Sequence, residues 1–297
     1  MSYYQQQNKH RLTIGQDGNA LTLLIAINLI VFVLLAFIKV LYYFGQGDAG
    51  TAAFNQEIFQ WVALPADLDT FITRPWTLLT HMFVHDTSSV WHILANMLWL
   101  WAFGFILQDL AGNRKLVPVF LYGALAGAIV YMAAYNVITP LKADLPYAYA
   151  CGASAGVMAI AIAATTISPG YRIFPMLNGG IPLWVITVIY LIIDLATIPY
   201  NNPGGHIAHL TGAVAGFAFV RLLQHGHDGS LWMNRFFDWV SNLFNPDKPA
   251  KGQAARSQLF YKAGVAPFTK KTMVTEQRVD EILEKIYHKG YGSLTDD

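Results

Sequence analysis

Hydrophobic residues gather into six long runs along the chain, separated by more polar connections. The first run, Ala20 to Phe44, is too long for the apolar core of a cleaved signal peptide, so we interpret it as a retained span. The other five runs cover Trp91 to Leu107, Leu116 to Ile138, Cys151 to Ile167, Ile181 to Ile198 and His206 to Leu223. A helix needs about 20 apolar residues to cross the hydrocarbon core of a bilayer. The pattern therefore predicts an all-α membrane protein, a bundle of six transmembrane helices followed by a polar C-terminal tail.

Composition supports this division of the chain. Hydrophobic residues make up 55% of the 297 residues and charged residues only 12%, against roughly 25% charged in a soluble domain. Residues 225–297 contain 19 of the 37 charged residues. We therefore divide the chain into an N-terminal segment (1–19), a membrane domain (20–223) and a tail (224–297). A net charge of +1 gives no reason to expect nucleic acid as a partner, whereas the lipid bilayer is an obligatory one.

Two stretches of the tail have hydrophobic residues at helical spacing. The first contains Trp232, Phe236, Trp239, Val240 and Leu243, and the second contains Val279, Ile282, Leu283 and Ile286. Aromatic and aliphatic residues on one face, with charged residues opposite, are typical of a helix that lies on a membrane surface. We predict such a helix for the first stretch. The second is short and needs a partner to stay folded, but the sequence does not indicate which.

Basic residues are concentrated at one end of the predicted spans. They are Lys9, Arg11, Arg114, Lys115, Arg172 and Arg221. The connections at the other end contain only Arg74 and Lys142, with Lys39 at a boundary. Cytoplasmic connections carry the excess of lysine and arginine, so both termini are predicted to be cytoplasmic. The expected location is the plasma (inner) membrane of a bacterium.

Four polar side chains fall at one predicted depth, near the outer ends of three spans. These residues are His92 and Asn96 on the second span, Ser154 on the fourth and His209 on the sixth. Polar groups inside a bilayer are costly, so each is a candidate for function or for hydrogen bonding between helices.

Small residues predict that two of these side chains meet. The fourth span is rich in glycine and alanine, and the sixth places Gly212 and Gly216 on the same face as His209. Such faces let two helices approach closely. If the fourth and sixth spans pack through them, Ser154 contacts His209, which gives a serine nucleophile and its general base.

A tetrahedral intermediate in acyl transfer also needs hydrogen-bond donors for its oxyanion. Asn96 lies four residues after His92, on the same face of the second span, and its amide can donate. The backbone N–H of Ser154 is unpaired within its helix because it lies in the first turn, at the positive end of the helix dipole. We predict that these two groups form the oxyanion hole.

Other interpretations compete with this one. A polar residue in a membrane helix commonly bonds to its own backbone or to a neighbouring helix. A histidine-lined metal transporter or metal site is a second alternative, because His81, His85, His92, His206 and His209 all fall on the outer side. The sequence lacks the His-Glu-x-x-His pattern of zinc proteases, and we predict no metal and no organic cofactor. Asp194, on the fifth span, is predicted to reach water at the outer end rather than to mark an ion path.

Four motifs in order resemble the rhomboid intramembrane serine proteases. They are Pro75 to His81 with Phe83 and His85, His92-Ile-Leu-Ala-Asn96, Gly152-Ala-Ser154, and Ala208-His209-Leu-Thr-Gly212 with Gly216. The resemblance covers about residues 20–223. It implies that Ser154 is the nucleophile, that His209 is the general base, and that His92 joins Asn96 and the Ser154 backbone in the oxyanion hole.

The resemblance also implies the activity. We expect an endopeptidase that cleaves transmembrane segments of other membrane proteins near the outer leaflet. The main alternative is a non-catalytic rhomboid-like protein that binds transmembrane clients. Two positions depart from the family pattern, because Thr77 follows Trp76 where arginine is common, and Met158 stands where bacterial members often have a tyrosine beneath the histidine.

Overall fold

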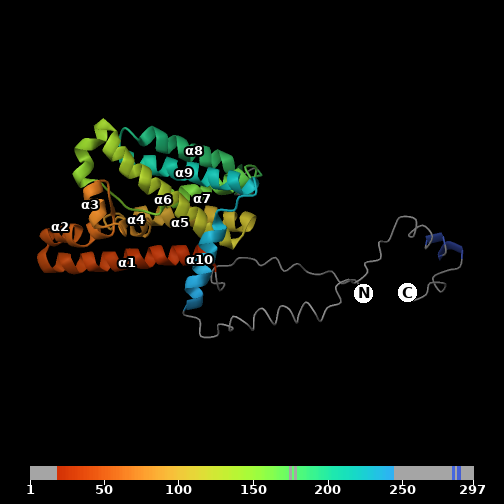
Figure 1. Cartoon of the computed structure of the whole chain (residues 1–297), viewed down its shortest axis with the longest axis horizontal. Helices are drawn as coiled ribbons and strands as arrows, with labels where there is room; N and C mark the ends of the chain where they lie inside the picture. The colour runs from red at the N-terminus through yellow and green to blue at the C-terminus, as the bar shows by residue number, and fades with distance from the viewer. Residues whose placement is uncertain (1–18, 174–175, 177–178, 244–282, 285, 289–297) are drawn as a thin grey trace. The chain divides into compact units, whose positions relative to one another are not determined.

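The computed structural model describes residues 19–173, 176, 179–243, 283–284 and 286–288. Its helices between residues 20 and 224 form a bundle (Figure 1). Four helices are long and apolar enough to cross a membrane: α1 (Ala20–Gln46), α5 (Val90–Ala111), α6 (Asn113–Val137) and α9 (Pro203–Gln224). Two shorter apolar helices are α7 (Ser154–Ile167) and α8 (Leu183–Thr197). The chain is an integral membrane protein with the predicted all-α fold. The count of six spans stays a prediction, because α7 and α8 are shorter than a usual span.

Local sequence signals set where the long helices begin. The side chain of Asn19 caps α1 by accepting hydrogen bonds from the backbone N–H groups of Leu21 and Thr22, at 3.0 and 3.2 Å. Gly112, with a φ of 88°, lets the chain reverse between α5 and α6. The α9 helix starts with Pro203 after Asn202, whose side chain accepts a hydrogen bond from Gly205.

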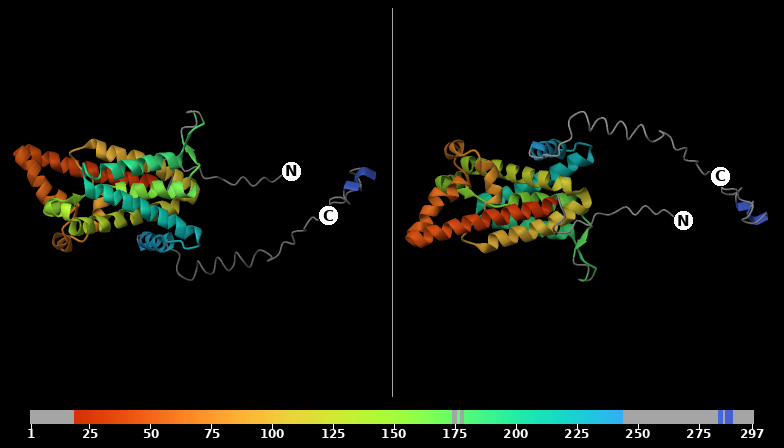
Figure 2. Two further views of the ribbon diagram at one scale, coloured as in Figure 1. Left: turned by 90° about the horizontal axis from the view of Figure 1, so that it is seen from above. Right: turned by 90° about the horizontal axis from the view of Figure 1, so that it is seen from below.

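Helix α7 is the centre of the bundle. Nine of its 14 residues are buried, and it packs most extensively against α9, α6 and α5 (Figure 2). Its contact with α9 is made through backbone atoms, because a Cβ at Gly212 would lie 2.1 Å from the carbonyl oxygen of Ala155. A Cβ at Gly216 would lie equally close to the carbonyl oxygen of Ala159. The predicted packing of these two spans through small residues is therefore present.

The connection between α1 and α5 is built from short elements. They are α2 (Asp48–Glu57), η1 (Phe59–Trp61), β1 (Leu64–Pro65), α3 (Leu68–Thr73), α4 (Thr77–Thr80) and η2 (His81–Phe83). Strand β1 pairs with β2 (Tyr149–Ala150), which lies just before α7. The carbonyl oxygen of His81 also accepts a hydrogen bond from Gly152 at 3.0 Å. These contacts fix the segment from which Ser154 emerges.

The remaining connections are short. They comprise η3 (Thr139–Tyr147) after α6 and the paired strands β3 (Arg172–Ile173) and β4 (Ile181–Pro182) before α8.

The first amphipathic stretch of the tail forms a helix, α10 (Ser230–Leu243), and its place on a membrane surface stays a prediction. Trp232, Phe236 and Trp239 are exposed on it, as expected for side chains that meet lipid. Its start is held by a bond from the indole N–H of Trp232 to the hydroxyl of Tyr122, at 2.6 Å, and by the ion pair between Lys115 and Asp228.

The chain divides into compact units at residues 239 and 240, so α10 begins in the same unit as the bundle. The boundary that we predict between residues 223 and 224 remains a prediction. In the second amphipathic stretch of the tail, Val279 and Ile282 lie outside the described residues.

The close contact of α7 and α9 predicts a large cost for one added methyl group. We expect Gly216→Ala to destabilise the protein by about 1–3 kcal/mol, because a rigid backbone carbonyl occupies the space. Gly45→Ala is the matched control, since Gly45 is also helical and its Cβ would meet nothing within 4 Å. Thermal unfolding in detergent measures both variants. Equal unfolding temperatures for the two would contradict this account of the packing.

Candidate active site

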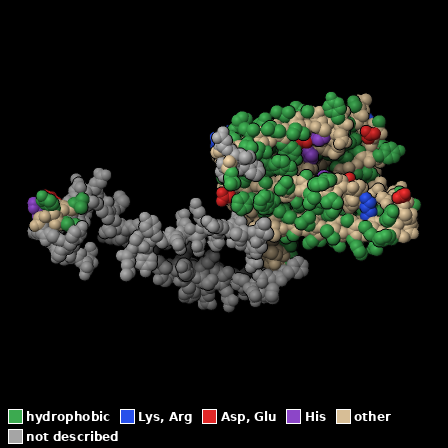
Figure 3. All heavy atoms as spheres, turned by 180° about the vertical axis from the view of Figure 1, so that it is seen from behind, with side chains coloured by type: hydrophobic (Ala, Val, Ile, Leu, Met, Phe, Trp, Pro, Cys, Tyr) green, Lys and Arg blue, Asp and Glu red, His purple; other side chains and the backbone are tan. Residues whose placement is uncertain are grey.

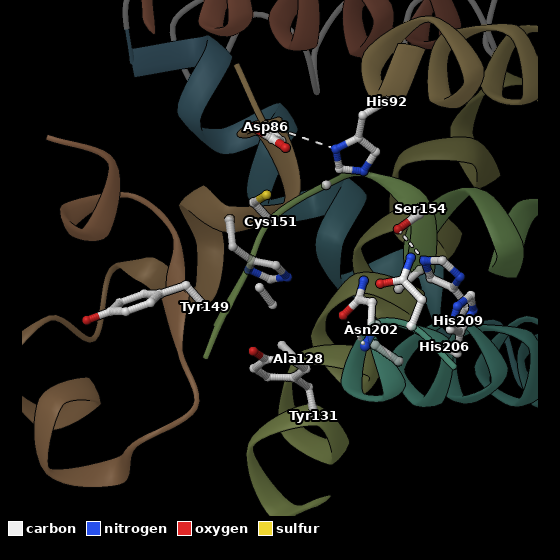
Figure 4. A pocket seen from close by; sticks show the side chains of 17 residues that line it. Asp86, His92, Ala128, Tyr131, Tyr149, Cys151, Ser154, Asn202, His206 and His209 are labelled. Atoms are coloured by element: carbon white, nitrogen blue, oxygen red, sulfur yellow. Dashed lines mark hydrogen bonds between the residues drawn. The ribbon is translucent and has the colours of Figure 1, made fainter. Parts of the chain in front are cut away.

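Ser154 is the first residue of α7 and is partly exposed to a cavity of about 450 Å³ (Figure 4). The chain reaches it through Gly152, which has a φ of 123°, a value that side chains rarely allow. A Cβ at Gly152 would also lie 3.1 Å from Nε2 of His92. Glycine therefore lets the backbone before Ser154 approach His92 closely.

The structure brings Ser154 and His209 together across the contact of α7 and α9. Nε2 of His209 lies 2.6 Å from Oγ of Ser154, within hydrogen-bond distance. Gly212 lies one turn after His209 and packs against the backbone of Ala155, the residue next to Ser154. The same small-residue contact that joins the helices thus sets the distance between these two side chains.

The environment of Asp194 differs from the predicted one. This residue is only 2% exposed and does not reach water, so that prediction is wrong. Its Oδ1 lies 3.0 Å from Nδ1 of His209 and 2.6 Å from Nδ1 of His206. The position of Asp194 near the outer end of its helix predicted contact with water, but its side chain faces the histidines of α9. The available signal was that Asp194 is the one charged residue in the predicted fifth span, which by itself indicates function.

The carboxylate of Asp194 determines the proton positions on His209. An ionised carboxylate only accepts hydrogen bonds, so Nδ1 of His209 must be the donor. A neutral imidazole then has its lone pair on Nε2, the atom that faces the hydroxyl of Ser154. The arrangement places an acceptor beside the serine hydroxyl.

His92 lines the cavity, whereas Asn96 is not among the described residues that do. Nδ1 of His92 lies 3.4 Å from the backbone nitrogen of Asp86, which can only donate. The proton of a neutral His92 is therefore on Nε2, the atom near Gly152. The amide of Asn96 donates to the carbonyl oxygen of His92 at 2.9 Å, and no bond joins it to Ser154.

The wall of the cavity combines polar and aromatic groups. It includes His92, Tyr131, Cys151, Ser154, His206 and His209. Histidine side chains are visible at a hollow in an otherwise mostly hydrophobic face of the bundle (Figure 3). Met158, one turn after Ser154, is buried inside the bundle.

Only one group of described residues has the side-chain spacing for a metal ion. The ligand atoms of Asp194, His206 and His209 all lie within 4.8 Å of one another. Burial lowers the pKa values of His81 and His85 to about 4, so both are neutral, and neither joins this group. The five outer histidines of the sequence analysis therefore do not assemble into one metal site.

Comparison with known families decides the classification. The model of the Rhomboid domain matches residues 73–225, which is more than half of the chain. The chain belongs to the rhomboid family. Rhomboid proteins are typically serine proteases that act on transmembrane substrates within a membrane, although some members are inactive. The part of this rhomboid that matches contains Ser154, His209 and Asp194, and all of α5 to α9.

Proposed function

We propose that this rhomboid is an active intramembrane serine endopeptidase in which Ser154 is the nucleophile and His209 the general base. The observation that carries the proposal is the 2.6 Å distance between Oγ of Ser154 and Nε2 of His209. A non-catalytic relative needs neither side chain, and this chain has both in contact at an accessible cavity.

The reaction follows from the positions of the protons. Oγ of Ser154 attacks the carbonyl carbon of the scissile peptide bond while its proton moves to Nε2 of His209. The tetrahedral intermediate collapses, the C–N bond breaks, and the imidazolium gives that proton to the leaving amine. Water then repeats the sequence on the acyl-enzyme, with His209 again as base, and restores Ser154. The residues named use no metal and no cofactor.

His92 and the backbone N–H of Ser154 are the best-placed donors for the oxyanion. The tautomer that Asp86 favours puts a hydrogen on Nε2 of His92, near the start of α7. The N–H of Ser154 lies in the first turn, at the positive end of the α7 dipole. Asn96, which the resemblance also assigns to this role, keeps one amide hydrogen free of its bond to His92, and we retain it as the third donor.

Asp194 is a positioning residue in this mechanism. Its carboxylate holds Nδ1 of His209 at 3.0 Å, orients the ring toward Ser154 and stabilises the imidazolium that forms. The resemblance implied a dyad of Ser154 and His209, and the geometry extends it to three residues.

The proposed setting follows the distribution of basic residues. We place both termini in the cytoplasm and the catalytic end of the bundle at the outer leaflet of a bacterial inner membrane. Substrates are transmembrane segments of other membrane proteins, and water reaches Ser154 through the cavity from the outer side.

The first prediction tests the two reacting residues. Ser154→Ala and His209→Ala should each abolish cleavage of a transmembrane substrate and labelling by a fluorophosphonate, because each removes one side of the proton transfer. Thermal unfolding of Ser154→Ala should stay close to wild type, whereas His209→Ala removes one hydrogen bond of the buried Asp194 and should unfold at a somewhat lower temperature while still folding. Cleavage retained by either purified, folded variant would remove that residue from the mechanism.

A second prediction tests Asp194. Asp194→Asn should lower kcat by about 10²- to 10⁴-fold with little change in KM, because an amide can donate to Nδ1 and leave the proton of His209 on Nε2. Thr187→Val is the matched control, since Thr187 is also buried on α8 but bonds only to the carbonyl groups of its own helix. Steady-state kinetics compare the two. If both variants lost activity equally, Asp194 would be a packing residue only.

A third prediction concerns the substrate. A helix must unwind before Ser154 reaches its backbone, and each unpaired backbone group in hydrocarbon costs several kcal/mol. A model span with a Gly-Ala pair in its outer part should therefore be cleaved faster than the same span with Leu-Leu there, or with the pair moved to the inner part. Gel analysis of the fragments in liposomes measures the three rates. Equal rates would show that helix weakness near the outer surface does not select the substrate.

A further inference from the structure

Two hydrogen bonds from different histidines converge on one carboxylate oxygen beside the proposed catalytic pair. His206 and His209 lie one turn apart on α9, and Nδ1 of each faces Oδ1 of Asp194 on α8. The hydrolytic mechanism uses only the bond from His209. That mechanism assigns no proton-transfer step to His206.

The other oxygen of this carboxylate, Oδ2, lacks within the described part of the chain the hydrogen bond that buried polar atoms normally have. The side chain of Asp194 is only 3% exposed, and its Oδ2 is buried with no hydrogen-bond partner among the described residues. A buried carboxylate oxygen without a partner is costly, and such an atom calls for an explanation such as an unseen ion or water. The unpaired Oδ2 is therefore consistent with a bound ion or water at this carboxylate.

The donor set fits a zinc ion. Imidazole nitrogen and carboxylate oxygen are normal Zn²⁺ ligands, and two histidines with one carboxylate leave a fourth position for water. Zinc bonds of about 2.0–2.1 Å in a tetrahedron put neighbouring ligand atoms about 3.3 Å apart. The nitrogen atoms now lie 2.6 and 3.0 Å from Oδ1 of Asp194, and all three ligand atoms are within 4.8 Å of one another. Small side-chain adjustments therefore bring the three ligand atoms to the spacing of a zinc site.

We propose that Asp194, His206 and His209 bind Zn²⁺ and that this binding reversibly switches off hydrolysis. The inhibitory half of the proposal rests on the proposed function, whereas the metal site stands on the three ligands themselves. The imidazole of His206, which hydrolysis does not use, acquires a role in this site.

Inhibition follows from the two nitrogens of His209. A metal on Nδ1 displaces the hydrogen there, and the neutral ring then has its hydrogen on Nε2. Nε2 donates to the oxygen of Ser154 in that state and has no lone pair to take the serine proton. Zinc therefore blocks the base without touching the nucleophile, and its removal restores the tautomer that Asp194 favours.

The ion has a route to the site. His206 and His209 both line the cavity that opens beside Ser154, and no lysine or arginine occurs among the described residues of that lining. The cavity also contains Asp86, whose charge attracts a cation.

The test uses the full-length protein in detergent without a histidine tag. Co²⁺, which absorbs visible light when bound in a tetrahedral site, is titrated into Ser154→Ala and into the double variant Ser154→Ala, His206→Ala. We expect saturable one-to-one binding in the first, and binding at least about 100-fold weaker in the second, since even an outer partner of a ligand contributes 10- to 100-fold. Zn²⁺ should displace the Co²⁺. Equal Co²⁺ spectra in both proteins, or no bound Co²⁺, would overturn the site.

Activity assays with Zn²⁺ test the switch separately. Wild type should be inhibited and should recover with a chelator, whereas His206→Ala, measured relative to its own activity without metal, should need at least about 100-fold more Zn²⁺ for the same fractional inhibition. His227→Ala, a change of an exposed histidine, is the control and should behave as wild type. Zinc that binds without inhibiting, or that inhibits His206→Ala equally, would overturn the switch. If no Ser154-dependent cleavage exists at all, the proposed function and the switch fail, and the Co²⁺ titration still decides the metal site.

Discussion

The contact of α7 with α9 is the constraint on which the rest of this rhomboid depends. At Gly212 and Gly216 there is no room for a Cβ, because the carbonyl oxygens of Ala155 and Ala159 would lie 2.1 Å away. Helices in a bilayer gain no hydrophobic free energy from one another, so backbone packing of this kind provides much of their attraction. The short distance between helices is also what lets Ser154 and His209 touch, since neither side chain is long.

A buried carboxylate next to this contact orients the ring of His209. Asp194 lies in an apolar bundle, where an ionised group is costly unless it is paired and hydrogen-bonded. Bonds from His206 and His209 meet much of that cost. The bond from His209 also determines which of its nitrogens faces Ser154. The stability of this region and the orientation of the His209 ring thus depend on one buried group.

The segments outside the long helices have a comparable positioning role. The strand pair of β1 and β2 and the bond from Gly152 to the carbonyl of His81 hold the chain just before α7. Without them, the first residue of a short helix would be free to fray. On the other side of the bundle, α10 is held at its start by Trp232 and by the ion pair of Lys115 with Asp228. Its exposed aromatic residues are suited to the membrane surface.

The sequence by itself determined the class of protein and most of the candidate site. Apolar runs of span length admit few structures other than a helical bundle, because backbone groups in lipid must bond within their own segment. Polar residues at one depth, together with Gly212 and Gly216, were enough to predict that Ser154 and His209 lie on facing helices. Those inferences depend only on position along a helix, which the sequence gives directly.

Only the tertiary structure decided how the side chains are turned toward one another. Asp194 was misplaced because depth along a helix says nothing about which face meets a neighbour. Asn96 was predicted as an oxyanion donor, and the structure adds that one of its amide hydrogens is donated to the carbonyl oxygen of His92, a contact that helical spacing alone does not reveal. The convergence of His206, His209 and Asp194 joins α8 to α9. The rotation of one helix against another sets such contacts, and packing of the whole bundle determines that rotation.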